Sequence, residues 1–239
     1  PFRDNRTISA RLNAIDSLID TGANYLIAKS LQGFGDLERI ITRIAIGTAR
    51  PTDLSGLRNS LERIPEIKAI IAPSKNSLIK KLNDNIDSFT TTLDLLHKAI
   101  VESPPSVIRD GGVIKEGYNK ELDTLNNINK DGNEFLLELE KNEKEKTGIS
   151  SLKVSYNKVH GYYIEISRGQ SKSVPSNYHR RQTLKNTERV IIPELKTYED
   201  KILKAKDEAL ALEKKLYHEL IETLQSYVEK LSQTAKNIA

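Results

Sequence analysis

The residues of this chain that are best suited to chemistry gather between Thr147 and Pro193. This stretch holds eight basic residues against two carboxylates, a net charge of +6, whereas the whole chain of 239 residues carries +4. The positive charge is therefore concentrated on one small part of the chain, which predicts binding of a polyanion. The basic residues are Lys153, Lys158, Arg168, Lys172, Arg180, Arg181, Lys185 and Arg189, and the acidic ones are Glu165 and Glu188.

Alternating apolar and polar residues in the same stretch predict a small, mostly antiparallel β-sheet. Its four expected strands cover residues 152–156, 161–167, 181–184 and 188–192. Two connections carry the same chemistry, Asn157-Lys158 in the first and Lys185-Asn186 in the second. Asparagine amides, lysine ammonium groups and turn N–H groups are suited to phosphate oxygens, so we expect contact with a nucleic-acid backbone that does not read base sequence. The alternative is that the asparagines serve only the turns, where they tolerate positive φ.

Neighbouring residues leave further alternatives open. His160 is either a phosphate donor or a structural residue of its turn. The charged run between Glu138 and Lys146 predicts a solvated helix face. Several tyrosines either stack on bases or, as is commoner, form the core of the small sheet. They are Tyr156, Tyr162, Tyr163 and Tyr178.

The other chemistry-bearing residues show no catalytic or metal-binding grouping. The chain has no cysteine, which excludes disulfides and thiolate metal sites, and its four histidines are scattered. The sequence Asp110-Gly111-Gly112 predicts a turn, because a phosphate-binding loop needs more glycines and a Lys-Ser or Lys-Thr pair at a helix start. We therefore expect a non-enzymatic chain without a cofactor or metal of its own. A nuclease is the disfavoured alternative, because no Asp/Glu/His set converges.

Helical periodicity dominates the rest of the chain. Apolar residues spaced by three and four predict helices over 7–20, 36–46 and 77–102. A further helix is expected to be capped by Thr52 and to bend or end at Pro65. Longer helices are expected on either side of the basic stretch, over 115–146 and 193–239. Neither is expected to be stable alone, so an antiparallel pair joined by the sheet at its tip is the simplest arrangement.

The predicted fold class is mainly α, a helical bundle with two long antiparallel helices and a small antiparallel β-domain inserted at their tip. The expected parts are residues 1–146, 147–192 and 193–239. No run of 18 apolar residues predicts a membrane span, and the first residues do not resemble a signal peptide, so we expect a cytoplasmic protein. A start without methionine and an end within a helical pattern suggest a piece of a larger protein.

Two long motifs in the basic stretch resemble a known family. Residues 152–167, LKVSYNKVHGYYIEIS, and residues 178–189, YHRRQTLKNTER, closely resemble the clamp region of the MutS family of bacterial DNA mismatch-repair proteins. Residues 35–39, 48–51 and 109–114 are similar to the core domain of that family, and residues 192–199 to its returning lever helix. The resemblance covers essentially the whole chain.

The resemblance implies that the long helices are levers and that a clamp at their tip closes over the DNA duplex away from the mismatch. It implies that Asn157 and Asn186 contact the DNA backbone, with Lys185, His160 and Arg181 beside them. Together with the chemistry of the two connections, this gives a set of expected DNA-binding residues: Asn157, Lys158, His160, Arg181, Lys185 and Asn186.

The resemblance also implies partners. These are double-stranded DNA including mismatched DNA, a homodimer of the parent protein, and a MutL-type mismatch-repair protein. The Phe-x-Glu wedge and the P-loop of the family are absent from this sequence. ATP and magnesium are therefore expected in an ATPase domain of the parent protein, to which the levers would couple the embrace of DNA. The alternative function is a helical scaffold whose basic β tip docks an acidic protein.

Overall fold

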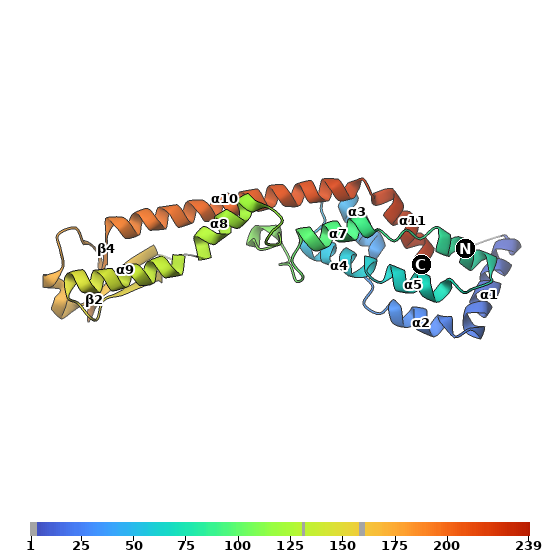
Figure 1. Ribbon diagram of the computed structural model, residues 1–239, viewed down its shortest axis with the longest axis horizontal. Helices are drawn as coiled ribbons and strands as arrows, with labels where there is room; N and C mark the ends of the chain where they lie inside the picture. The colour runs from blue at the N-terminus through green and yellow to red at the C-terminus, as the bar shows by residue number, and fades with distance from the viewer. Residues whose placement is uncertain (1–3, 131, 158–160) are drawn as a thin grey trace. The chain divides into compact units, whose positions relative to one another are not determined.

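The computed structural model describes residues 4–130, 132–157 and 161–239, which belong to two compact units (Figure 1). The first unit comprises Pro1–Tyr118 and Glu213–Ala239, and the second comprises Asn119–Leu212. The helix α10, Pro193–Gln225, begins in the second unit and ends in the first. The structure is mainly helical with one small antiparallel sheet, which confirms the predicted fold class.

The first unit is a helical bundle around a core of isoleucine and leucine side chains. Leu54, Leu57 and Leu61 of α4 are fully buried and, at spacings of three and four, lie on one face of that helix. The last part of α10 joins the same core through Leu220 and Leu224. The elements are α1 (Asn5–Asp20), α2 (Ala23–Ser30), α3 (Leu37–Ala45), α4 (Pro51–Leu61), α5 (Ile64–Ile71), α6 (Ser77–Asp84), α7 (Thr90–Ala99), the short 3₁₀ helix η1 (Ile108–Asp110) and α11 (Val228–Ile238).

Several helical features of the first unit differ from the predicted ones. The predicted cap at Thr52 is wrong: α4 begins at Pro51, and the carboxylate of Asp53 accepts the Arg50 N–H at 2.8 Å, so Asp53 satisfies the helix start. The helix expected over 77–102 is divided into α6 and α7, with Phe89 at φ +48° directly before α7. The helices α2 and α5 were not predicted.

The turn at Gly111 and Gly112 receives a carboxylate from α10. Both glycines have positive φ, at 72° and 75°, which confirms the predicted turn. Glu213, whose side chain is buried, accepts hydrogen bonds from the N–H groups of Gly112 at 3.0 Å, Val113 at 2.6 Å and Ile114 at 2.8 Å. Successive N–H groups in such a turn form a concave site for an anion, which here is the protein's own glutamate.

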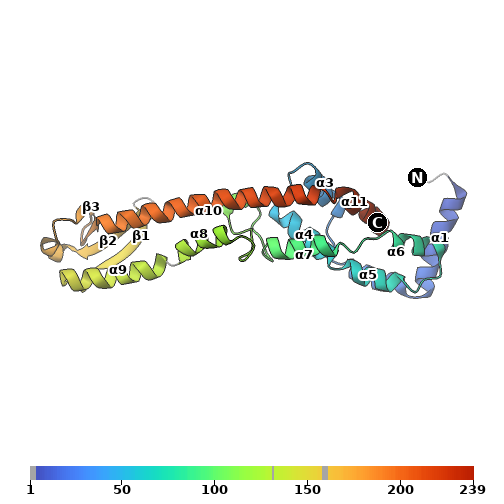
Figure 2. The ribbon, with the colours of Figure 1, turned by 45° about the horizontal axis from the view of Figure 1, so that its top comes forward.

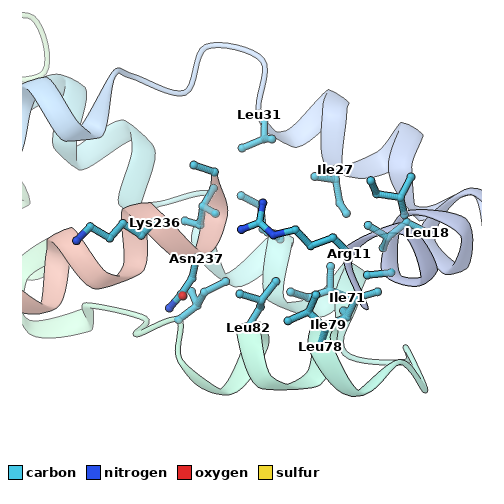
Figure 3. Close-up of a pocket in the computed structure, with 16 residues that line it drawn as sticks. Arg11, Leu18, Ile27, Leu31, Ile71, Leu78, Ile79, Leu82, Lys236 and Asn237 are labelled. Carbon is cyan, nitrogen blue, oxygen red and sulfur yellow. The ribbon is translucent and has the colours of Figure 1, made fainter. Parts of the chain in front are cut away.

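An apolar cavity of about 340 Å³ lies in the first unit (Figure 3). Its lining includes the basic residues Arg11 of α1 and Lys236 of α11, and α1 also exposes Leu12 and Ile19. None of the residues that the sequence predicts to bind DNA lines this cavity. Much of its wall comes from Leu18, Ile27, Leu31, Ile71, Leu78, Ile79 and Leu82.

The second unit contains α8 (Lys120–Lys130), α9 (Gly132–Thr147) and the first part of α10, which run alongside one another in Figures 1 and 2. The chain passes along α8 and α9 and returns along α10, as predicted for an antiparallel pair. Phe135 of α9 stacks on Tyr198 of α10 with ring centroids 4.3 Å apart. The helix predicted over 193–239 is not continuous, since a turn at Ser226–Tyr227 separates α10 from α11, and α8 and α9 account for the described part of the helix predicted over 115–146.

The sheet lies in the second unit, and each predicted strand is present within two residues of its expected bounds. Its strands are β1 (Lys153–Asn157), β2 (Gly161–Ser167), β3 (His179–Thr183) and β4 (Thr187–Ile191), and the 3₁₀ helix η2 (Arg168–Ser173) follows β2. All neighbouring strands are antiparallel, in the order β1-β2-β4-β3. Ile164, Ile166 and Val190 form a small core with Leu152 and Leu195.

Candidate nucleic-acid interface

The register of the strands places the two basic connections at opposite ends of the sheet. Asn157 of β1 lies opposite Gly161 at the start of β2, whereas Ser167 at the end of β2 lies opposite Thr187. The Arg168 N–H donates to the carbonyl of Asn186 at 3.0 Å. Gly161 and Ser167 are six residues apart on one strand, so the two connections are separated by about 20 Å. Although both residues are expected to contact the DNA backbone, Asn157 and Asn186 therefore do not lie together.

The strand order is the physical reason. In a simple meander β3 would pair with β2, and both hairpin connections would point to the same end of the sheet. Here β4 pairs with β2, and β3 occupies the outer edge. Since β4 is antiparallel to both β2 and β3, the β3–β4 connection lies at the end where β2 finishes. We call this end, with the 184–186 connection and the start of η2, the Asn186 edge, and the other end the Asn157 edge.

The Asn186 edge exposes the residues suited to a phosphate backbone. The Leu184 N–H donates to the carbonyl of Thr187 at 2.8 Å, which leaves Lys185 and Asn186 exposed at the tip of a tight hairpin. Phe89 is the only non-glycine residue with positive φ in the described part of the chain. The backbone at Asn186 therefore does not require an asparagine, so positive φ does not account for this residue. Arg168 is exposed beside this hairpin.

Two arginines of this stretch form ion pairs with the sheet's own carboxylates. Arg180 pairs with the buried Glu188 at 3.1 Å. Arg189 pairs with Glu165 at 3.2 Å and lies over the ring of Tyr163, 4.4 Å from its centroid. These arginines hold the strands together. Exposed basic residues of the stretch include Arg181 at the irregular step of β3, Lys185 and Arg168.

The Asn157 edge is docked against the helices of its own unit. Glu199 of α10 accepts the Tyr162 N–H at 3.3 Å. Gly161 has φ +69°, and a Cβ there would lie 1.7 Å from a carboxylate oxygen of Glu199, so this position requires glycine. Tyr162 also contacts the rings of Tyr156 and Tyr198, at centroid distances of 4.9 and 5.7 Å. Two of the predicted DNA-binding residues of this connection, Lys158 and His160, lie outside the described residues.

Most of the four tyrosines have a structural role, as expected if they form the core of the small sheet rather than stack on bases. Tyr163 and Tyr178 are buried, and Tyr162 packs against the small core of the sheet. Tyr156 is 56% exposed on the Asn157 edge. Burial, followed by the hydrogen bond to Glu143 and the charge of that residue, raises the pKa of Tyr178, so its hydroxyl is a neutral donor at physiological pH.

The glutamates of α9 correct another prediction. Glu140 accepts the Val154 N–H at 2.9 Å and the Lys144 ammonium at 2.7 Å. Glu143 is buried, accepts the Tyr178 hydroxyl, and pairs with a lysine of its own helix. The prediction of a solvated face is wrong for these two residues, which attach α9 to β1 and to the turn before β3.

Glu140 is charged at physiological pH. Its partial burial alone would raise its pKa. Hydrogen bonds from Lys144 and the Val154 N–H, together with the charges of Lys144 and Lys153, outweigh burial and lower the pKa of Glu140 below its ordinary value. The attachment of β1 to α9 therefore depends on an ionised carboxylate.

Residues 117–208 match the family model described as MutS family domain IV. This part of the chain is similar to that domain of the MutS family. The matched residues contain α8, α9, the whole sheet and the first part of α10. MutS family domain IV is a DNA-binding clamp domain of mismatch repair, which agrees with the polyanion binding expected from the charge of the stretch.

The described part of the chain has neither a metal-holding group of side chains nor a membrane-spanning helix. Over residues 4–130, 132–157 and 161–239, no group of three or more His, Cys, Asp or Glu side chains is arranged to hold a metal ion. Within the same ranges, no helix is long and apolar enough to cross a membrane.

Proposed function

We propose that this chain holds double-stranded DNA by its sugar–phosphate backbone at the Asn186 edge, as the clamp and lever part of a MutS-type mismatch-repair protein. The observation that carries the proposal is the exposed Lys185-Asn186 hairpin, because neither residue is required by the turn and both suit phosphate oxygens. Arg168 and Arg181 add cationic side chains on the same sheet.

The Asn157 edge takes a different role in this proposal. It is tied to α10 through Glu199 and packed through Tyr162, so it connects the clamp to the lever. Of the predicted residues, Lys185, Asn186 and Arg181 are retained as DNA contacts, whereas Asn157 is assigned to the attachment.

The contact is proposed to be independent of base sequence. Reading of bases requires bidentate side chains on a helix or ribbon that enters a groove. A short hairpin carrying one lysine and one asparagine reaches phosphates from outside the duplex. Matched and mismatched duplexes are therefore expected to bind this chain equally.

The wider role follows from the family. We propose that the chain performs no catalysis, carries no cofactor, and acts in the cytoplasm. In the parent protein, α8, α9 and α10 would couple the clamp to an ATPase domain that uses ATP and magnesium. A homodimer would bring two clamps around one duplex, and a MutL-type protein would act with the parent. A stiff helix suits such coupling, because a small rotation at one end displaces the other.

The test is a fluorescence-anisotropy titration of the chain with labelled matched and mismatched duplexes at several salt concentrations. If about four to six phosphates are neutralised, log affinity falls against log salt with a slope of roughly −4 to −5. Both duplexes should give the same slope. A flat salt response, or binding to an acidic polypeptide but not to DNA, would instead support the acidic-protein alternative. Cleavage of the labelled DNA in the presence of divalent metal would contradict the non-enzymatic role.

A further inference from the structure

The helix α10 carries two carboxylates that accept backbone N–H groups from turns elsewhere in the chain. Glu213 accepts three, from Gly112, Val113 and Ile114, within the first unit. Glu199 accepts the N–H of Tyr162 within the second unit. Glu213 therefore attaches α10 to the turn at residues 111–114, and Glu199 attaches α10 to the start of β2.

Both turns are built around glycines with left-handed backbone. Gly111 and Gly112 have φ of 72° and 75°, and Gly161 has φ of 69°. Such backbone directs successive N–H groups towards one point and favours an anion there. Within the described residues no ion pair forms to Glu213 or Glu199, and both carboxylates accept backbone N–H groups rather than pairing with cations.

The two carboxylates project from nearly the same side of α10. They are fourteen residues apart, which at 100° per residue leaves an angular offset of about 40° and an axial separation of about 21 Å. Apolar burial is not directional, so an apolar stripe tolerates a modest rotation of the helix. The hydrogen bonds of 2.6–3.0 Å to Glu213 do not tolerate such a rotation, because hydrogen bonds weaken steeply with distance and angle.

We propose that Glu199 and Glu213 are pins that fix the rotation of α10 about its own axis. With both pins in place, the side chains between them keep one set of exposed and buried positions. When one pin is lost, that segment of α10 rotates and exposes positions that are normally buried, while the remaining helices keep their packing.

The absence of cysteine makes the proposal testable by thiol labelling. Single cysteines are placed at Ala209, which lies between the pins and is 6% exposed, and at Ala14 of α1, which is 7% exposed. Each is combined with Glu213→Gln, and the maleimide reaction rate is measured on the folded chain. The matched control is Glu208→Gln, since Glu208 is an exposed glutamate on the same helix paired with Lys204.

In the Glu213→Gln background, labelling at position 209 should accelerate about tenfold or more, the scale of one lost charge-assisted hydrogen bond. Labelling at position 14 should remain unchanged, as should labelling at both positions in the Glu208→Gln background. Equal acceleration at positions 209 and 14 would show general loosening and overturn the proposal. An unchanged rate at 209 would overturn it equally.

A second variant keeps the test decisive if Glu213→Gln does not fold. Glu199→Gln removes the other pin, and the same pair of cysteines reports on it. The amide hydrogen exchange of Tyr162 should accelerate in this variant, because the uncharged amide oxygen of glutamine is a weaker acceptor than the carboxylate. No change at position 209 in the folded Glu199→Gln chain would refute the idea of two pins.

Discussion

Removing the charge of Lys185 is expected to weaken duplex binding, whereas removing the amide of Asn157 is not. The paired substitutions are Lys185→Gln and Asn157→Ala, with Lys204→Gln as the matched lysine control. Lys204 is an exposed lysine on α10 that pairs with Glu208. Asn186→Ala completes the set, because it makes at one edge the change that Asn157→Ala makes at the other.

The magnitudes follow from the separation of the two edges. A cation about 4 Å from a phosphate gains about 1 kcal/mol in water, so Lys185→Gln should raise Kd about fivefold. Over the separation of about 20 Å between the edges, the same interaction is about 0.2 kcal/mol before screening. Screening with a Debye length of about 8 Å reduces it to a few hundredths of a kcal/mol. A charge at the Asn157 edge therefore adds almost nothing to the binding free energy of DNA held at the Asn186 edge.

The assay is anisotropy with a labelled duplex at physiological salt and at two further salt concentrations. Lys185→Gln should also reduce the magnitude of the salt slope by about 0.9, the value for one lost phosphate contact. Asn157→Ala and Lys204→Gln should leave both affinity and slope unchanged. Equal losses for Asn157→Ala and Asn186→Ala would refute the assignment of the interface to one edge. So would a larger loss at Asn157.

Two other predictions concern the attachment of the sheet to its helices. Since folding lowers the pKa of Glu140 below its ordinary 4.5, its contribution to stability is complete above that value and is lost as pH falls through the folded pKa. Urea unfolding between pH 6 and pH 3 should therefore show a smaller acid destabilisation in Glu140→Gln than in the parent chain, and identical pH profiles would contradict this. Gly161→Ala should cost about 2–4 kcal/mol, from left-handed strain and displacement of Glu199, measured by hydrogen exchange of the β2 amides. Gly169→Ala, whose Cβ would meet nothing within 4 Å, should change that exchange little, and an equal effect of the two alanines would remove the role assigned to Glu199.

Local patterns in the sequence determined the elements and their chemistry. Alternation of period two located β1 to β4 within two residues, because one face of each strand must be apolar whatever its neighbours are. The concentration of basic residues around the sheet was likewise visible without a structure. Long helices on either side followed from spacings of three and four, although the separation of α10 from α11 did not, since a turn at Ser226–Tyr227 leaves the apolar spacing almost intact.

Tertiary structure decided where those elements meet. Whether β3 or β4 pairs with β2 depends on long-range packing, and that choice places Asn157 and Asn186 at opposite ends of the sheet. The burial of Glu143 and Glu213 could not be predicted from the sequence either, because a glutamate in a charged helix is solvated unless distant donors converge on it. Sequence therefore determined which residues could grip a polyanion. Only the folded chain, by pairing strands and donors far apart in sequence, determined which of them share a surface.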